Sequence, residues 1–232
     1  DAMLLAGDGE GGGDDVLVST VDGGWWQVRA DGRVQALPAW LRRRFSAVCA
    51  DGQGQLWACL ADGERWRIGL LLRSALAPTV SQAGGPGAAL AASSWSLPEP
   101  VTALAWQADG SRLLAVTPES GTLYALLPGD ATVRRLATVP KGSGRLAGLA
   151  LEADGAAWCA LKGGWSVARF APDGSLDRII GLPVPCPTGV ALVGPPGALQ
   201  LCVPSAREGL FSEVLGIAPA SGRVLALRLQ PA

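Results

Sequence analysis

The feature that most constrains this chain is a repeated unit of about forty residues, made of short apolar runs separated by Asp-Gly turns. In its clearest copy the apolar runs cover residues 146–151, 156–161, 167–170 and 176–182, with turns at Asp154-Gly155 and Asp173-Gly174. Glycine adopts a positive φ without steric cost, and an Asp side chain can hydrogen-bond the backbone that follows it. Such runs and turns predict a four-stranded antiparallel sheet.

Further copies appear when the Asp-Gly turns are aligned. The same strand, turn and strand recur at residues 47–60, with the turn Asp51-Gly52, and at residues 101–116, with the turn Asp109-Gly110. Segment 26–34 resembles segment 166–176, and another unit opens at Pro187. Repeated units of this kind predict an all-β chain with the fold of a β-propeller, whose four-stranded antiparallel blades pack face to face.

The number of blades follows from where the units begin. Complete units start near Ser46, Val101, Arg145 and Pro187, and the strands before Leu37 supply the later part of one more blade. We therefore expect about four to five blades. We also expect residues 1–14 to be a flexible, acidic, Gly-rich leader, and residues 15–232 to be one propeller domain with a low-complexity insertion at about 74–97.

Composition excludes several classes of protein. The net charge of −1 and the pI near 5.5 provide no basic surface for nucleic acid. No apolar run approaches the roughly 20 residues that span a bilayer, so we expect a soluble protein without a transmembrane segment. The chain has no His and no Asn, which excludes Ser-His and Cys-His catalytic pairs and imidazole metal ligands.

The five cysteines are Cys49, Cys59, Cys159, Cys186 and Cys202. Their number is odd and none forms a CxxC pair. Cysteine is among the most buried residue types, so we expect buried free thiols, with a disulfide or a reactive site as the less favoured alternative.

The N-terminal segment contains one motif that resembles a cofactor site. Residues 7–12, GDGEGG, match the glycine pattern of dinucleotide-binding proteins, which requires a strand before it and a helix after it. A β-run at residues 16–21 follows instead, and the acidic side chains would repel a pyrophosphate, so we predict a loop and no cofactor. The chain does not begin with Met, so we expect a processed or incomplete N-terminus, and the compartment stays open, an organelle or a secretory one included.

A family resemblance is carried by the segment ARFAPDGSLDRIIGLPVPCPTGVAL and by residues 205–210 and 219–224 that follow it. Residues 44–46 and 101–106 look like the openings of earlier blades. From about residue 15 onward the chain resembles the senescence marker protein, gluconolactonase and luciferin-regenerating enzyme family. The resemblance implies a six-bladed propeller and the activity of calcium- or zinc-dependent lactonases.

The family's functional residues are replaced in this sequence. In the family a Glu from the first blade, an Asn that opens a middle blade and an Asp that opens a later blade hold the metal on the propeller axis, and an Arg-x-Asn element binds substrate. The resemblance places the metal-binding Asn on Thr102, the Asp on Ala147 and the substrate-binding Asn on Ser46, which leaves Arg44 of that element. The blade that carries the Glu is missing by our count. Because hard cations need several oxygen ligands, the substitutions predict no bound metal and no catalytic residue.

Two hypotheses follow. In the first, the chain is a gluconolactonase-like pseudoenzyme that acts as a binding or structural subunit with a protein partner. In the alternative, it is a lactonase or esterase whose calcium or zinc is held by Glu99, Glu152 or a carboxylate outside the chain. Because a propeller must cover its last blade, we also expect residues 1–13 to close a ring with residues 224–229, or the gap to be filled by further residues or by another protein.

Overall fold

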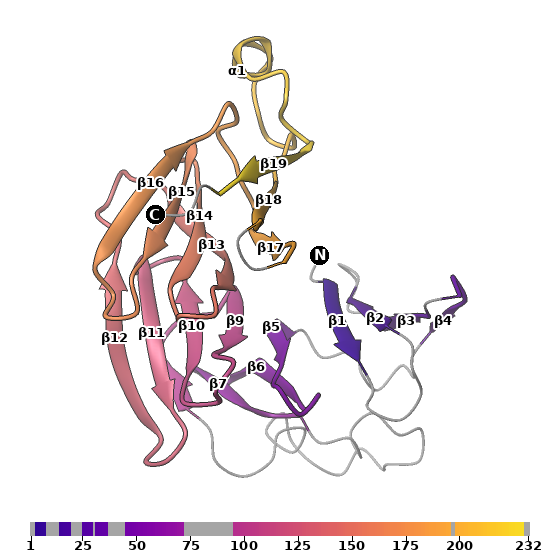
Figure 1. Cartoon of the computed structure of the whole chain (residues 1–232), viewed down its shortest axis with the longest axis vertical. Helices are drawn as coiled ribbons and strands as arrows, with labels where there is room; N and C mark the ends of the chain where they lie inside the picture. The colour runs from indigo at the N-terminus through magenta and orange to yellow at the C-terminus, as the bar shows by residue number, and fades with distance from the viewer. Residues whose placement is uncertain are drawn as a thin grey trace. The chain divides into compact units, whose positions relative to one another are not determined.

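The computed structural model describes residues 3–7, 14–19, 25–29, 31–36, 45–71, 95–195 and 198–229. Within these residues, five sheets follow one another along the chain, and the strands of each sheet keep their sequence order (Figure 1). The chain divides into two compact units, one of residues 1–113 and 126–133, the other of residues 114–125 and 134–232. The β-propeller class expected from the repeat is confirmed, with four-stranded sheets as blades.

The strands are distributed evenly over the sheets. The first sheet holds β1 (Met3–Gly7), β2 (Asp14–Ser19), β3 (Trp25–Val28) and β4 (Val34–Ala36), and the second holds β5 (Phe45–Ala50), β6 (Leu56–Asp62), β7 (Arg65–Leu70) and β8 (Trp95–Leu97). The third holds β9 (Ala103–Trp106), β10 (Leu113–Thr117), β11 (Thr122–Leu127) and β12 (Thr132–Thr138), and the fourth holds β13 (Arg145–Leu151), β14 (Ala157–Lys162), β15 (Ser166–Phe170) and β16 (Leu176–Gly181). The fifth has three strands, β17 (Ala191–Val193), β18 (Gln200–Pro204) and β19 (Val224–Arg228), with the short helix α1 (Ser212–Ile217) between the last two.

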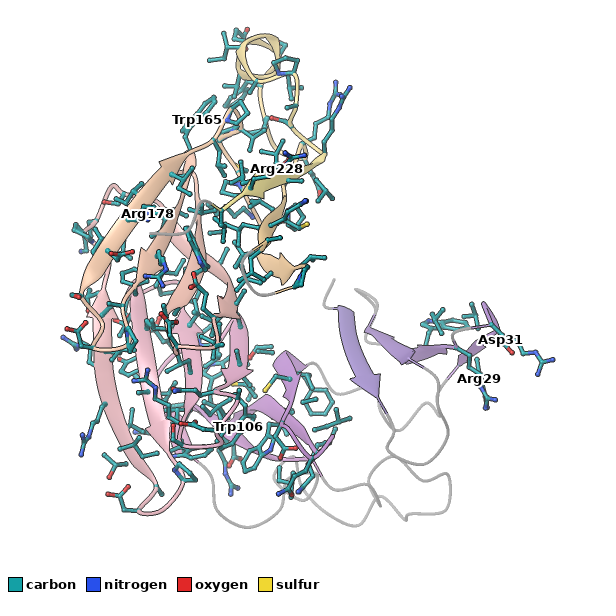
Figure 2. All side chains as sticks on the ribbon, in the orientation of Figure 1. Arg29, Asp31, Trp106, Trp165, Arg178 and Arg228 are labelled. Carbon is teal, nitrogen blue, oxygen red and sulfur yellow. The ribbon has the colours of Figure 1, made fainter. Side chains whose placement is uncertain are left out.

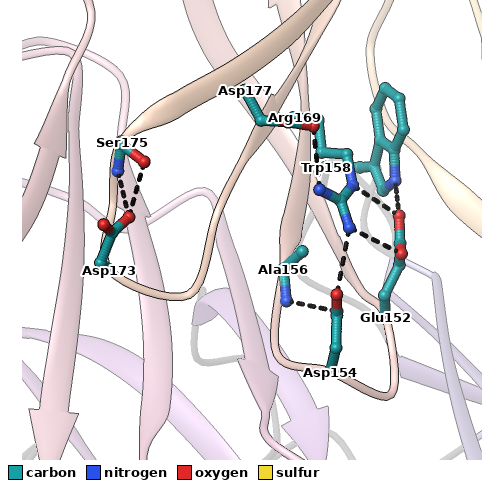
Figure 3. Close-up of polar contacts among 8 residues, drawn as sticks. All are labelled: Glu152, Asp154, Ala156, Trp158, Arg169, Asp173, Ser175 and Asp177. Atoms are coloured by element: carbon teal, nitrogen blue, oxygen red, sulfur yellow. Dashed lines mark hydrogen bonds and ion pairs between the residues drawn. The ribbon is translucent and has the colours of Figure 1, made fainter. Parts of the chain in front are cut away.

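The predicted Asp-Gly turns are present. In the fourth sheet, Asp154 Oδ1 accepts a hydrogen bond from the Ala156 backbone N–H at 2.9 Å, and Asp173 Oδ1 accepts one from Ser175 at the same distance (Figure 3). The glycines of these turns, Gly155 and Gly174, have φ of 87° and 91°. The Asp side-chain hydrogen bond and the positive φ of Gly are the two properties for which we expected Asp-Gly at these positions. Because each turn ends one strand and begins the next, the turns set the length of the strands.

The N-terminal segment differs from our expectation. Strand β1 pairs antiparallel with β2, with Leu5 opposite Val16, so the leader expected over residues 1–14 contains a paired strand and the first sheet has four strands. We gave weight to the Gly and Asp content of this segment and missed the short apolar run at residues 3–6. A strand follows the dinucleotide-like glycine pattern, as predicted, although residues 8–13 lie outside the described residues.

The insertion also ends earlier than expected. Trp95 pairs with Ile68, which adds β8 to the second sheet inside the range that we assigned to the insertion. Trp95 and Leu97 are buried, so they belong to the core of this sheet. Residues 72–94 lie outside the described residues.

The apolar side chains of neighbouring sheets form the core, and three of the five cysteines are buried. Buried Trp158, Ala160 and Val167 of the fourth sheet form one core cluster with Leu201 and Val203 of the fifth. All five cysteines are free thiols; Cys49, Cys59 and Cys159 are buried, as predicted, whereas Cys186 and Cys202 are only half-buried. Burial raises the pKa of the Cys49 and Cys159 thiols to about 12. Among the described residues, no helix is both long and apolar enough to cross a bilayer.

Candidate functional site

The positions that the resemblance singled out occupy equivalent places in successive sheets. The residue directly after the first strand begins the turn in three sheets, namely Asp51, Gln107 and Glu152. Ser46, Thr102 and Ala147 each lie five residues before it. Thr188 precedes Gly189 as Ala147 precedes Gly148, which gives a fourth equivalent position. We did not single out Thr188 from the sequence, although alignment of the repeats would have found it.

The backbone is irregular at two of these positions. The register between β5 and β6 shifts between Phe45 and Ala47, which places Ser46 at the irregularity. The register between β13 and β14 shifts between Ala147 and Ala150. A bulge changes the direction in which a side chain points and often lies beside a functional site, so these strand openings are the candidate site.

In the first unit, Ser46 packs inward. Its Oγ is buried and, apart from the Cys59 sulfur, has no hydrogen-bond partner among the described residues. Burial raises the pKa of the Cys59 thiol, and hydrogen bonds from the Ser46 hydroxyl and the Val101 backbone lower it in part. A hydroxyl oxygen without exposed surface contacts a ligand only after a local rearrangement. Thr102 is exposed next to Val101, and Arg44 lies outside the described residues.

In the second unit, the equivalent positions offer little polar chemistry. Ala147 presents a methyl group at the place where the resemblance expects a carboxylate. Next to it, Gly148 has φ of 67°, and a Cβ at this position would stand 2.5 Å from the Gly189 Cα. Thr188 is exposed, and its Oγ1 donates to the Pro204 carbonyl at 3.3 Å, the same oxygen that accepts the Thr188 N–H.

Glu152, a ligand in the alternative hypothesis, is held in an ion-pair cluster (Figure 3). Its Oε1 accepts hydrogen bonds from Trp158 Nε1 at 2.6 Å and from Arg169 Nε at 2.9 Å, and its Oε2 accepts one from Arg169 Nη2 at 2.9 Å. Arg169 also contacts Asp154 at 3.2 Å and Asp177 at 2.9 Å. The Arg169 guanidinium, and then the Trp158 indole, lower the pKa of the Glu152 carboxyl. Both oxygens of Glu152 are therefore occupied by donors from the protein.

An equivalent bond is present in the second sheet, and a different side-chain bond holds the same turn position in the third. Trp57 Nε1 donates to Asp51 Oδ2 at 3.0 Å, at the positions equivalent to Trp158 and Glu152. In the third sheet, Arg112 Nε donates to Gln107 Oε1 at 2.7 Å. The sequence carries a signal for the hydrogen bond between the Trp indole and the carboxylate, because Asp51 and Trp57, like Glu152 and Trp158, are six residues apart. We did not use this spacing in the sequence analysis.

Carboxylates do not gather elsewhere in the described part of the chain. Over these residues, no group of three or more Cys, Asp or Glu side chains is placed to hold a metal ion. Glu99, the other ligand of the alternative hypothesis, lies half-buried in the connection between β8 and β9. The candidate positions of each unit are thus strand openings: hydroxyl groups in the first unit, and methyl, hydroxyl and backbone groups in the second.

Most of the chain matches a known protein family. The family model for the SMP-30/gluconolactonase/LRE-like region matches residues 12–207. A crystal structure of a calcium-binding protein, regucalcin from Agrobacterium tumefaciens, superimposes with a TM-score of 0.68 at 17% identity, covering 98% of this chain and 76% of that one.

Two further solved structures are similar in fold. A luciferin-regenerating enzyme superimposes with a TM-score of 0.71 at 18% identity, covering 98% of this chain and 76% of that chain. Virginiamycin B lyase from Staphylococcus aureus superimposes with a TM-score of 0.56 at 13% identity, covering 99% of this chain and 70% of that chain. At these identities the likeness establishes the fold alone, and chemistry has to be argued from the residues.

Proposed function

Because this chain belongs to the SMP-30/gluconolactonase/LRE-like family, we propose that it is a gluconolactonase-like propeller that has lost metal-dependent lactone hydrolysis and serves as a binding or structural subunit. The observation that carries the proposal is the chemistry of the strand openings. Where the resemblance expects an Asn and an Asp, the chain has Thr102 and Ala147.

The ligand chemistry supports this proposal. Calcium takes six to eight oxygen ligands, and carboxylates supply most of the affinity. A methyl group at Ala147 contributes no ligand, and the Thr102 hydroxyl is neutral. Glu152 cannot replace them without giving up Arg169 and Trp158, which would leave the half-buried Arg169 with only Asp154 and Asp177 as partners. Breaking such a pair on one side costs more than the pair contributes net.

A structural role is supported by the edge strand of the fifth sheet. The fifth sheet has three strands where the preceding four have four each, and among the described residues β19 pairs only with β18. An uncovered strand edge presents a row of backbone donors and acceptors, which proteins normally pair or cover. A protein partner that pairs with the edge strand β19 would meet that requirement.

Metal binding and turnover test the proposal together. Titration calorimetry with calcium and with zinc should show no heat above dilution, and gluconolactone hydrolysis should equal background with either metal. Regucalcin, measured in parallel, is the control, since that protein is described as calcium-binding.

One result would support the lactonase alternative instead. Stoichiometric uptake of metal together with metal-dependent turnover would overturn the proposal, and Glu99→Gln and Glu152→Gln would then identify the carboxylate that holds the ion. Because Glu152→Gln alone also weakens the ion-pair cluster, its unfolding free energy has to be measured beside its metal affinity.

A further inference from the structure

Two cations lie directly opposite each other at the opening of the fourth sheet. Arg145, the first residue of β13, pairs with Lys162, the last residue of β14, and both are exposed. Among the described residues, no hydrogen bond or ion pair reaches either charged group. Like charges placed opposite each other on an antiparallel pair destabilise it. An anion bound between the two side chains would remove this repulsion.

The fold does not require cations at these two places. Cys186 lies three residues before Gly189, as Arg145 lies three residues before Gly148, so Cys186 holds the equivalent place in the fifth sheet. Across from it lies Ala206, whose N–H donates to the Cys186 carbonyl at 2.8 Å. An uncharged pair is thus compatible with this position of the repeat, and the two cations of the fourth sheet are explained by something other than folding.

Backbone contacts fix the segments that carry the two cations. The linker before β13 touches the turn after β14, since a Cβ on Gly144 would stand 2.8 Å from the Gly164 nitrogen. In the same turn, the Gly163 N–H donates to the Pro185 carbonyl at 2.8 Å, which joins the turn to the linker between the fourth and fifth sheets. Figure 2 labels Trp165, the last residue of this turn. A ligand bound here therefore has to order two side chains and no backbone, which limits the entropy lost on binding.

The charge at this junction is not balanced by its own residues. The three segments that meet here contain no Asp or Glu and three cations; they are residues 139–145, 162–165 and 182–190, with Lys141, Arg145 and Lys162. Glu119 lies on the corresponding turn of the third sheet, and among the described residues no ion pair joins it to these cations. The junction is therefore locally positive.

We propose that Arg145 and Lys162 together bind the carboxylate or phosphate group of a small ligand at the opening of the fourth sheet. A guanidinium offers two parallel N–H donors to such a group, and an ammonium adds a point charge with three donors. A neutral ligand would leave the repulsion between the two cations in place, so the pair favours an anionic one.

This inference rests on the binding role proposed above and gives the ligand a chemical class. Its test measures anion binding, whereas the test of the function measures metal binding and hydrolysis, so either can fail without the other.

Calorimetric titration of the full chain with inorganic phosphate and with citrate, each at constant ionic strength, is the first measurement. At least one of the two anions should bind saturably. Arg145→Met and Lys162→Met should each raise its dissociation constant at least about tenfold, because each removes one charge-assisted contact. Arg134→Met is the matched control: Arg134 is exposed near the other end of β12, and the dissociation constant should stay unchanged.

Thermal unfolding provides a second readout. The anion that binds should raise the unfolding midpoint of the native chain above its value in chloride at the same ionic strength, because it binds the folded state. Arg145→Met should reduce this rise. Without the anion, Arg145→Met should unfold no more easily than the native chain, since it removes a repulsion.

Three results would overturn the proposal. The first is the absence of saturable binding by either anion, and the second is equal binding by the native chain and both variants. The third is a clear loss of stability in Arg145→Met without the anion, which would show that a carboxylate of the chain itself already pairs with Arg145.

Discussion

Gly148 lies so close to Gly189 that a Cβ on Gly148 would stand 2.5 Å from the Gly189 Cα and 2.9 Å from the Val190 nitrogen. The two glycines hold equivalent places in the repeat: Gly148 lies at the register shift inside β13, and Gly189 lies two residues before β17. Because the neighbouring atoms belong to the backbone, no side-chain movement can make room. This contact therefore sets how closely the openings of the fourth and fifth sheets approach.

Gly148→Ala should destabilise the protein more than an alanine at another glycine with positive φ. Gly163 is the control, because its φ is 84° and no heavy atom lies within 4 Å of a Cβ placed there. Gly163→Ala should cost about 1–2 kcal/mol of unfolding free energy from backbone strain alone. Gly148→Ala should cost about 1–3 kcal/mol more from overpacking. Urea unfolding measures both, and equal losses would contradict the close approach.

The cation in the ion-pair cluster should matter more than its exposed partners. Arg169→Met leaves Glu152, whose side chain is 20% exposed, without a cation, and should cost about 2 kcal/mol of unfolding free energy. Arg169→Lys should recover part of this loss, because an ammonium cannot make both bonds to Glu152. Asp177→Asn is the control: Asp177 is 41% exposed, and its loss should cost less than about 1 kcal/mol.

The stability that Glu152 contributes should depend on pH in a defined direction. Arg169 holds the pKa of the folded Glu152 carboxyl below its ordinary value of 4.5. The contribution is therefore complete above that ordinary value, and it is lost as the pH falls through the lowered pKa. The difference in unfolding free energy between the native chain and Glu152→Gln should be constant from pH 7 to pH 6 and shrink toward pH 3. A difference that grew on acidification would show that the pKa is raised.

Much of the fold was predictable because local chemistry repeats. Each Asp-Gly turn fixes the end of one strand and the start of the next, so β13–β16 were found to within one residue at either end. The prediction failed where composition and pattern disagreed. Strand β1 lies beside an acidic, Gly-rich stretch, and β8 follows a stretch without period, and in both cases the composition of the neighbouring residues hid a short strand.

The candidate site was harder to predict, because the burial and the hydrogen-bond partners of its side chains depend on residues that are distant in the sequence. The resemblance to the family led us to expect Thr102 and Ala147 in the places of two metal ligands. It did not show that the Ser46 hydroxyl is buried beside Cys59, or that both oxygens of Glu152 bind Arg169 from another strand. The hydrogen bond between Glu152 and Trp158, by contrast, could have been predicted, because the spacing of the two residues recurs in the second sheet, where the equivalent bond is present.

Three tryptophans of the first unit allow the value of an indole hydrogen bond to be measured. The rings of Trp57 and Trp106 meet edge to face at 5.0 Å, and Trp95 lies within 6.4 Å of both. Figure 2 labels Trp106. Trp57 Nε1 donates to Asp51 at 3.0 Å, whereas Trp106 Nε1 is buried without a hydrogen-bond partner among the described residues.

Trp57→Phe and Trp106→Phe remove the same atoms from one cluster but differ in what the indole N–H was doing. Trp57→Phe loses a bond to a carboxylate, and Trp106→Phe removes a buried donor that is unsatisfied. We therefore expect Trp57→Phe to cost about 1–3 kcal/mol more unfolding free energy than Trp106→Phe. In an Asp51→Asn background the difference between the two losses of unfolding free energy should become smaller, because Trp57 then no longer donates to a carboxylate. A larger loss for Trp106→Phe than for Trp57→Phe would show that the Trp106 indole has a partner in solution.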